Sequence, residues 1–406
     1  MSCDLISLPL SDIAKFKYGK TIRKQDIEDE GQFPVHSGYT TVGYLSNYMY
    51  EEPQLMIVCR GAGGTGDIKM SPPKVSITNL AIVITCDESK VCKDYLYWVL
   101  KLADTYSLRT GSAQPQITIN SLDSFNVVIH RDLSTQRTIA DFLNKLNSKI
   151  GVNTETNQTL EQMAQAIFKS WFVDFDPVKA KINGEPPKGM DAATASLFPE
   201  KLVESELGLI PEGWDVGTLS DVAKYCSART KTDSITLENY ISTENMLAEK
   251  KGVTAASKLP TAKTVAAYKS GDILVSNIRP YFKKIWLAEG SGGRSNDVLG
   301  FESVSANTES YLMNVLYQDT FFEYMTRTSK GAKMPRGDKT AIMNWEMAVP
   351  PVELREAFSA IVDKFYQLIP QNRAQNATLE SLRDTLLPKL LSGELSLTDS
   401  LEVTNV

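Results

Sequence analysis

The side chains best suited to chemistry in this 406-residue chain lie in basic segments with few acidic neighbours. Residues 323–340 carry five basic and two acidic side chains, and residues 269–286 carry four and one, with aromatic residues between them. Residues 106–117 of the first half hold an arginine and two glutamines in a corresponding place. Arginine pairs with guanine and glutamine with adenine through bidentate hydrogen bonds, whereas lysine suits phosphate contacts. These segments favour a nucleic-acid partner, although ordinary solvated loops remain the alternative.

The candidate DNA-binding residues share a basic or amide side chain within these segments or at the matching strand end. They are Arg60, Arg109, Gln114, Gln116, Arg279, Lys283, Lys284, Arg327, Lys330, Lys333, Arg336 and Lys339.

Motifs for catalysis are mostly missing. Gly61–Gly66 matches the dinucleotide pattern GxGxxG, but Pro72 and Pro73 follow too closely for the helix that this fingerprint requires. The chain has no Walker-type phosphate loop, no GxSxG sequence and no [DN]-P-P-[YF] sequence for amino-methyl transfer. With His36 and His130 as its only histidines, an imidazole-based metal site is not expected. We expect no catalytic residue, metal or cofactor in this chain; a nucleotide-binding enzyme using Gly61–Gly66 is the alternative.

The composition is that of a folded protein, with 42% hydrophobic and 23% charged residues and a net charge of −6. Residues 349–406 carry a net charge of −3, so the acidic total does not exclude basic loops elsewhere. Five cysteines without a CxxC spacing do not suggest a disulfide framework. The first 20 residues lack the pattern of a secretory signal, and no apolar run is long enough to span a bilayer. We expect a cytoplasmic protein.

The chain repeats itself. Short segments of the first half recur in the same order 209 to 220 residues later. The matching pairs are Ser11–Lys15 with Ser220–Lys224, Leu55–Arg60 with Leu274–Arg279, Gly111–Pro115 with Gly331–Pro335, Phe125–Ile129 with Trp345–Val349, and Asn157–Glu161 with Asn376–Glu380. This order indicates a tandem duplication of a unit of roughly 200 residues.

Each unit begins with a mixed part and ends in a long helix. The expected strands are Leu55–Cys59, Leu80–Thr85, Phe125–Ile129, Ile273–Ser276 and Glu346–Val349, and the expected short helices are Lys93–Leu102 and Ser310–Tyr317. Apolar residues then follow a 4,3 spacing that is typical of a coiled-coil seam. The first seam is Ile139, Leu143, Leu146, Ile150, Asn153, Asn157, Leu160, Ala164 and Ile167. The second is Ile361, Phe365, Leu368, Asn372, Gln375, Leu379, Leu382 and Leu386.

Polar residues in the middle of both seams suggest how the two helices pair. If the helices run antiparallel, Asn153 and Asn157 meet Asn372 and Gln375 at the crossing, which would fix the register. Some 30 residues of helix span about 45–55 Å. The alternative is that each helix packs only on its own domain.

The expected fold is therefore α+β: two similar mixed domains separated by two long helices that form an antiparallel coiled coil. The expected boundaries are 1–130 for the first domain, 131–176 for its helix, 177–211 for a linker, 212–348 for the second domain, 349–395 for its helix and 396–406 for an acidic tail.

The whole chain resembles the specificity subunits of type I restriction–modification systems, in its layout and in four local segments. These are Ser134–Ala140, Phe168–Pro177, Leu207–Trp214 and Leu386–Leu395. The resemblance implies two target-recognition domains, each reading one half of a split double-stranded DNA sequence, with the coiled coil as spacer. It also implies methyltransferase subunits that use S-adenosylmethionine, and restriction subunits that use ATP and Mg²⁺. Because the two loops differ in sequence, we expect non-identical half-sites. A coiled-coil protein scaffold without DNA binding is a further alternative.

Overall fold

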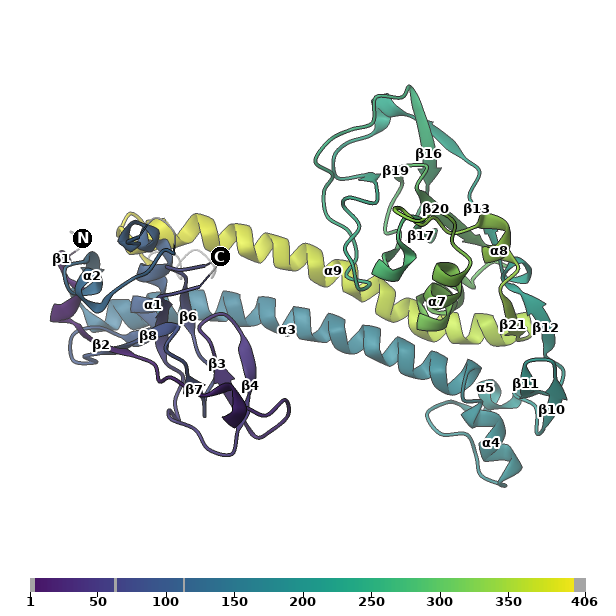
Figure 1. The fold of residues 1–406 in the computed structure, drawn as a ribbon, viewed down its shortest axis with the longest axis horizontal. Coiled ribbons are helices and arrows are strands. Elements are labelled where there is room, and N and C mark those ends of the chain that lie inside the picture. Colours follow the sequence, from purple (N-terminus) through teal and green to yellow (C-terminus); the bar gives the residue numbers. More distant parts are fainter. Residues whose placement is uncertain (1–3, 62–63, 112–113, 398–406) are drawn as a thin grey trace, which may run out of the picture. The chain divides into compact units, whose positions relative to one another are not determined.

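The longest elements of the chain are two helices of 40 residues each, α3 (Leu133–Phe172) and α9 (Val352–Leu391). The structure is a computed structural model, and it describes residues 4–61, 64–111 and 114–397 (Figure 1). The chain divides into two units, and both long helices pass from one unit into the other. The first unit holds residues 1–152 with 375–406, and the second holds residues 153–374. The expected division placed each long helix outside the domains, whereas these units divide both helices near their middle.

The first unit contains what we call head 1 (residues 4–130), built from three small sheets. A ribbon pairs β1 (Leu5–Pro9) with β9 (Asn126–His130). An antiparallel sheet has the order β2 (Ala14–Tyr18), β8 (Ala81–Cys86), β5 (Leu55–Val58) and β6 (Ile68–Met70). A third sheet joins β4 (Thr41–Leu45), β3 (Phe33–His36) and β7 (Ser76–Ile77). The helical elements are α1 (Lys93–Leu102), η3 (Thr105–Leu108) and α2 (Ile119–Asp123).

The second unit contains head 2 (residues 212–348), in which the same arrangement recurs. A ribbon pairs β12 (Asp215–Thr218) with β21 (Glu346–Val349). An antiparallel sheet has the order β13 (Ala223–Tyr225), β20 (Val298–Ser303), β17 (Ile273–Ser276) and β18 (Ile285–Leu287). The third sheet joins β14 (Arg229–Lys231), β16 (Thr264–Tyr268), β19 (Gly292–Arg294) and β15 (Tyr240–Ile241). The helical elements are η6 (Pro280–Phe282), α6 (Glu309–Tyr317), α7 (Asp319–Arg327) and α8 (Lys339–Met343).

The ribbon and the four-stranded antiparallel sheet thus follow one strand order in both heads, as the internal repeat predicts, whereas the third sheet has three strands in head 1 and four in head 2. The central strands β5 and β17 are buried along their whole length, because four consecutive apolar or small residues fill a strand covered on both faces. All five expected strands and both expected short helices are present, with bounds that agree to within a residue. Helix α7 and most strands of the third sheets were not anticipated, because their sequences are short and mixed in polarity.

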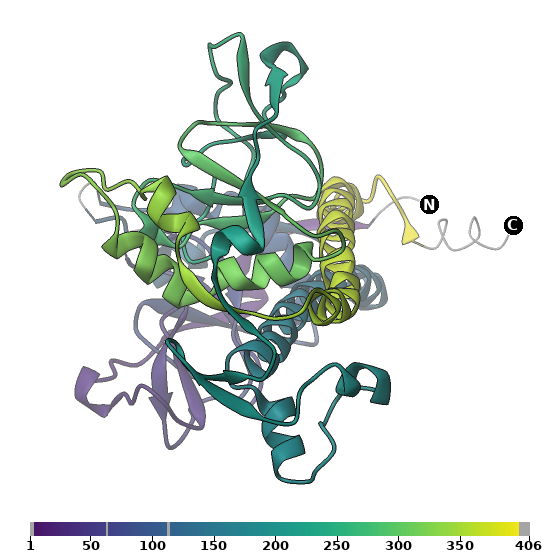
Figure 2. The same ribbon diagram turned by 90° about the vertical axis from the view of Figure 1, so that its right-hand side faces the viewer.

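Each head is fixed to a long helix of its own unit by buried polar contacts. In the first unit, Gln136 Oε1 of α3 accepts a hydrogen bond of 2.8 Å from the amide of Cys92, and Asn144 Oδ1 accepts one of 2.9 Å from Trp98 Nε1. In the second unit, where the head lies against α9 (Figure 2), Asn314 Nδ2 of α6 donates to the Tyr366 hydroxyl at 3.0 Å. These contacts make each head and its helix a single packed body.

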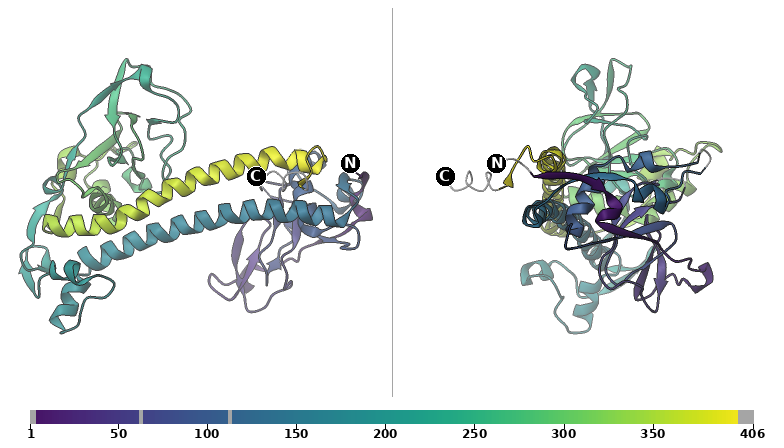
Figure 3. Two further views of the ribbon diagram at one scale, coloured as in Figure 1. Left: turned by 180° about the vertical axis from the view of Figure 1, so that it is seen from behind. Right: turned by 90° about the vertical axis from the view of Figure 1, so that its left-hand side faces the viewer.

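The two long helices also pack on one another within each unit, so the expected alternative of separate packing is not what the structure shows. In the first unit, Asn376 Nδ2 donates to the carbonyl of Ile150 at 3.3 Å. In the second, Asn372 Nδ2 donates to Asn157 Oδ1 at 2.9 Å. Residue numbers rise along α3 as those of its neighbours in α9 fall, so the helices are antiparallel in both units (Figure 3).

The expected seam agrees with burial on α3 but not on α9. All nine expected seam residues of α3 are buried or half-buried. On α9, Leu368 and Leu382 are 39% and 42% exposed, and Gln375 is exposed as well. The residues that α9 turns inward along this seam are Val362, Phe365, Ile369, Asn372, Asn376, Leu379, Arg383, Leu386 and Leu390. These residues also follow a 4,3 spacing. Every second one of the expected seam residues, namely Phe365, Asn372, Leu379 and Leu386, belongs to this observed set as well.

The frame of α9 was mistaken because the prediction assumed that the most apolar heptad faces inward. Asn376 and Arg383 lie in the true seam, and both satisfy polar groups of α3: Arg383 Nη1 donates to Asn147 Oδ1 at 3.3 Å. The register is instead set by large apolar residues near the ends of α9, where Phe358 and Leu390 are fully buried against the heads.

Residues 177–211, expected as a linker with one short helix, are folded over much of their length and lie within the second unit. They form α4 (Asp176–Ile182), α5 (Ala192–Ser196) and a hairpin of β10 (Leu202–Ser205) with β11 (Gly208–Pro211). Val178, Phe198 and Ile210 are buried in the core of the second unit. Pro177 lies in the first turn of α4, where its missing N–H costs nothing, and Pro211 is the last residue of β11, whereas Pro186 and Pro187 lie in the irregular segment between α4 and α5.

Candidate nucleic-acid interface

Both heads carry the same closed loop at the Gly-x-x-x-Pro sequence. In head 1 the amide of Thr110 donates to the carbonyl of Gln116 at 2.8 Å, and the Gln116 amide donates back at 2.9 Å. In head 2 Lys330 and Arg336 form the same pair of bonds, both 2.9 Å. Each loop opens with a glycine at positive φ, 88° at residue 111 and 103° at residue 331, a conformation that favours glycine. Ser112 and Ala113 lie outside the described residues.

Each loop is attached just beyond the central strand of its sheet. In head 1 the Ile117 amide donates to the Cys59 carbonyl at 3.0 Å, directly after β5. In head 2 the Gly337 amide donates to the Asn277 carbonyl at 3.2 Å, and the Arg279 amide donates to the Pro335 carbonyl at 2.8 Å, directly after β17. The fold therefore brings together segments that lie 50 or more residues apart in the sequence.

In head 1 the candidate residues differ in how available their side chains are. Arg109 is exposed; its Nε donates to the Thr65 carbonyl at 2.6 Å, and its guanidinium lies 4.3 Å from the centre of the Tyr106 ring. Gln114 is exposed, whereas Gln116 is half-buried. Arg60 is half-buried, with its guanidinium 5.6 Å from the Tyr18 ring, and its Nε has no hydrogen-bond partner among the described residues. Arg109 and Gln114 are therefore the best placed of the four.

Three of the basic side chains in head 2 are paired with carboxylates. Lys330 pairs with Asp338, Arg336 Nη2 lies 3.1 Å from Asp297, and Lys283 Nζ lies 3.0 Å from Asp319. The hydrogen bond that Lys330 donates to Asp338 raises the pKa of Lys330, and the one that Lys283 donates to Asp319 raises the pKa of Lys283. The hydrogen bonds from Lys250 and Lys283 in turn hold the pKa of Asp319 below its ordinary value.

A fourth basic residue of head 2 is used inside the fold. Lys284 Nζ donates to the Thr243 carbonyl at 2.6 Å, and burial lowers its pKa. The charge count from the sequence omitted Asp297 and Asp319 because they lie outside the two basic segments. The uncompensated positive charge near this loop is consequently smaller than the sequence suggested.

The remaining basic candidates of head 2 are exposed and make no ion pair with any residue that the structure describes. They are Arg279, Arg327, Lys333 and Lys339. Arg279 has a φ of 51° and begins η6, so its amide is bound to the loop while its side chain is exposed. The guanidinium of Arg327 lies 5.4 Å from the centre of the Tyr324 ring.

The glycine-rich segment Gly61–Gly66 does not form the start of a helix. The Gly66 amide donates to the Val58 carbonyl and the Asp67 amide to the Gly64 carbonyl, both at 2.8 Å, and strand β6 follows. A dinucleotide fingerprint requires a helix N-terminus for the pyrophosphate, so the structure does not support that alternative. Ala62 and Gly63 lie outside the described residues.

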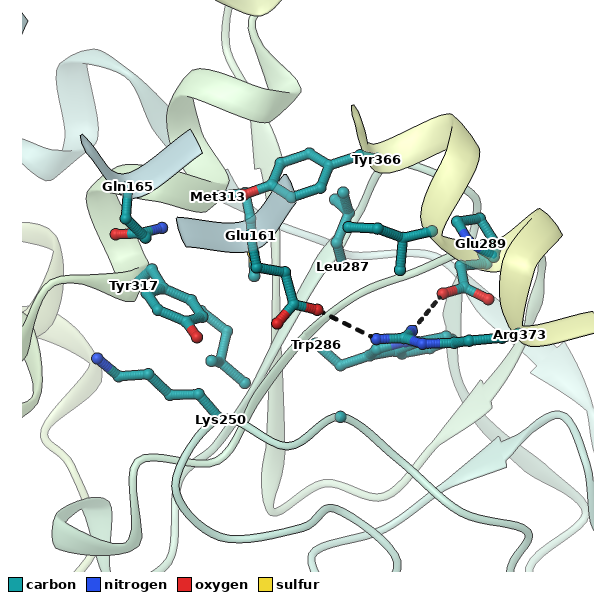
Figure 4. A pocket seen from close by; sticks show the side chains of 14 residues that line it. Glu161, Gln165, Lys250, Trp286, Leu287, Glu289, Met313, Tyr317, Tyr366 and Arg373 are labelled. Atoms are coloured by element: carbon teal, nitrogen blue, oxygen red, sulfur yellow. Dashed lines mark hydrogen bonds and ion pairs between the residues drawn. The ribbon is translucent and has the colours of Figure 1, made fainter. Parts of the chain in front are cut away.

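A small pocket of about 70 Å³ in the second unit shows a different kind of site (Figure 4). Arg373 lies between two carboxylates, donating to Glu161 at 3.3 Å and to Glu289 at 2.9 Å. Trp286 and Tyr317 line it. Burial raises the pKa of Glu161, and the charge of Arg373 opposes that rise. Both carboxylates are already used by one guanidinium, so the pocket serves to connect α3, α9 and head 2.

Within the described ranges, the chain shows neither a metal-binding cluster nor a membrane-spanning helix. No three His, Cys, Asp or Glu side chains in these ranges converge in a metal-binding group. The cysteines at 59, 86, 92 and 226 are free thiols, and Cys3 lies outside those ranges. No helix within them combines the length and apolar character that crossing a bilayer demands.

Comparison with known proteins identifies the class. Residues 7–162 match the family described as the type I restriction modification DNA specificity domain. The HindI specificity subunit of Haemophilus influenzae is 26% identical over 339 residues, covering 69% of this chain and 71% of that protein. The MjaIX specificity subunit of Methanocaldococcus jannaschii is 26% identical over 332 residues, covering 75% and 69%.

The solved structure of a type I restriction–modification S subunit from M. genitalium shares the fold. It superposes with a TM-score of 0.63 at 14% identity, covering 96% of each chain. The family match and the curated relatives indicate a DNA-specificity subunit, and the solved structure shows that the fold is shared. Residues 7–162 belong to the family of type I restriction–modification DNA specificity domains, and the chain as a whole is similar to specificity subunits of those systems.

Proposed function

We propose that the two heads read the two halves of a bipartite double-stranded DNA sequence, and that the two half-sites differ. The observation that carries this proposal is the closed loop, which has one backbone geometry in both heads but different side chains. Head 1 presents Gln114, whereas head 2 presents Lys333 beside Arg336. Side chains with different hydrogen-bonding groups select different base edges in the major groove.

We further propose that the reactions belong to partner subunits. Modification subunits would supply S-adenosylmethionine and methylate adenine, and restriction subunits would supply ATP- and Mg²⁺-dependent cleavage, in the cytoplasm where the DNA is. This chain would bind no cofactor itself.

The test is to express the chain with a modification subunit and to sequence the methylated sites. We expect adenine methylation at one split sequence, and none from the chain alone. A variant in which residues 331–336 are replaced by the sequence of 111–116 should change one half of that sequence and leave the other half intact. Lys188→Ala, which alters an exposed lysine far along the chain from either loop, is the matched control.

Two outcomes would contradict the proposal. Methylation by the chain without a partner would make it an enzyme. A loop exchange that leaves both halves of the sequence unchanged would show that these loops do not read DNA, as would be expected of a coiled-coil scaffold without a DNA-binding role.

A further inference from the structure

A tyrosine followed three residues later by an arginine occurs in both heads, shortly before the closed loop. In head 1 the pair is Tyr106 and Arg109, with the guanidinium carbon 4.3 Å from the ring centre. In head 2 it is Tyr324 and Arg327, at 5.4 Å. The pairs sit on η3 and on the last turn of α7, which are different elements at the same place in the order of the fold. Because the backbone differs at these two places, the repeat of the fold does not by itself explain why both heads carry an arginine stacked on a tyrosine.

The tyrosines are held in place by their hydroxyl groups. The Tyr106 hydroxyl donates to the carboxylate of Asp67, which raises the pKa of the tyrosine, although the ring itself is 49% exposed. The Tyr324 hydroxyl donates to the Ala341 carbonyl at 3.1 Å. Each tyrosine, exposed at position 106 and half-buried at position 324, is fixed at the far end of its ring and offers that ring as a platform for the arginine beside it.

The arginines are oriented on these platforms. Arg109 is held twice, because its Nε also donates to the carbonyl of Thr65, a buried residue within the glycine-rich segment. With Nε occupied, the two terminal nitrogens remain for a partner. A guanidinium fixed in one plane loses less rotamer freedom on binding than a free side chain does.

The lack of a carboxylate partner distinguishes these two arginines from Lys330 and Arg336, and the stacked tyrosine distinguishes them from the other unpaired basic side chains of the loops. Neither Arg109 nor Arg327 makes an ion pair with any described residue, whereas Arg336 and Lys330 lie against Asp297 and Asp338. The two terminal nitrogens of a guanidinium that has no carboxylate partner fit the O6 and N7 acceptors of guanine. This pairing is the commonest specific contact of arginine with DNA.

We propose that Arg109 and Arg327 make the guanine contact that determines sequence in the two half-sites, with Tyr106 and Tyr324 as positioning residues. The inference rests on the proposed function and adds to it the residues that choose a base. It also gives the glycine-rich segment a role, since its turn presents the Thr65 carbonyl that fixes Arg109.

The experiment uses the chain assembled with its modification subunit and reads methylated sites by sequencing. Arg109→Lys keeps the charge but loses the planar donor pair, so discrimination at one guanine should fall by about ten- to a hundred-fold. Arg327→Lys should do the same in the other half-site only. Tyr106→Leu should relax the same position as Arg109→Lys although the arginine is present, and Tyr106→Phe, which keeps the ring, should relax it less.

Arg23→Lys is the control, because Arg23 is an exposed arginine of head 1 paired with Asp26. It should leave the methylated sequence unchanged. If Arg109→Lys and Arg327→Lys also leave it unchanged, while alanine at either position weakens binding to all sequences alike, both arginines contact phosphate and the proposal is overturned. If the unaltered complex methylates no split sequence, the proposed function itself fails, which keeps the two outcomes distinct.

Discussion

Asn372 donates a hydrogen bond of 2.9 Å from Nδ2 to Oδ1 of Asn157, across the two long helices of the second unit. Asn157 is 8% exposed, and its own Nδ2 lies 3.5 Å from the carbonyl of Ile369. A paired amide layer in an otherwise apolar seam costs some stability and restricts the register in which the helices can meet. This layer restricts the register together with the large apolar residues near the ends of α9, but Asn372 belongs to both candidate frames of that helix and does not choose between them.

Replacing one member of the pair should cost more than replacing both. Asn372→Leu leaves Oδ1 of the buried Asn157 without a donor, so the free energy of unfolding should fall by about 1–3 kcal/mol. Adding Asn157→Leu removes the unpaired group and should recover most of that loss. Chemical denaturation of the two single variants and the double variant tests this, and equal losses in all three would contradict it.

The seam shows how far the sequence alone could lead. On α3 the apolar heptad and the true seam coincide, so the pattern sufficed. On α9 two frames share Phe365, Asn372, Leu379 and Leu386, and the more apolar one includes Leu368 and Leu382. The choice between them depends on contacts with residues of α3 and of the heads, which periodicity within one helix does not contain.

The corrected frame predicts opposite results at two adjacent positions. Ile369 is 4% exposed and Leu368 is 39% exposed. Ile369→Ala should lower the free energy of unfolding by about 2–5 kcal/mol. Leu368→Ala, the matched neighbour, should lower it by less than about 1 kcal/mol. A larger loss at Leu368 in denaturant titrations would restore the original frame.

Glu161 should make stability depend on pH in the direction opposite to an ordinary ion-paired acid. Burial raises its pKa above the ordinary 4.5, against the attraction of Arg373. The folded state then holds this proton more tightly than the unfolded state does, so stability falls as pH rises from 4.5 through the raised pKa. Glu161→Gln does not titrate but can still accept from Arg373, so it should gain stability relative to the unaltered chain between pH 4.5 and neutrality.

Unfolding curves of both proteins at several pH values measure this difference. Glu289→Gln is a suitable control, since Glu289 accepts from the same guanidinium at 2.9 Å. A gain in stability for Glu161→Gln that is as large at pH 3 as at pH 7 would exclude the ionisation of Glu161 as its cause.

The sequence predicted only those parts of the candidate interface that a short local pattern marks. The repeated Gly-x-x-x-Pro sequence and its basic neighbours predicted both loops. The partners of those neighbours were not visible: Asp297 and Asp319 come from other segments, and the sequence did not show that Tyr106 and Tyr324 stack on Arg109 and Arg327. Pairing across the fold is set by tertiary structure, so a count of charges in one segment overestimates the free charge.

Lys333 and Arg336 lie in one loop but should respond differently to substitution. Lys333 is exposed and unpaired among the described residues, so Lys333→Ala should weaken binding to all sequences about equally and reduce the slope of log K against log salt by about 1. Arg336 lies against Asp297, and Arg336→Ala should cost about 1–3 kcal/mol at one base pair if it exchanges that carboxylate for a guanine. Binding titrations of the assembled complex at several salt concentrations, on cognate and single-mismatch duplexes, separate the two effects. Asp297→Asn removes the negative charge beside Arg336 and leaves the arginine in place, so the affinity of the complex for DNA should rise. An unchanged affinity would show that Arg336 keeps its structural role when DNA is bound.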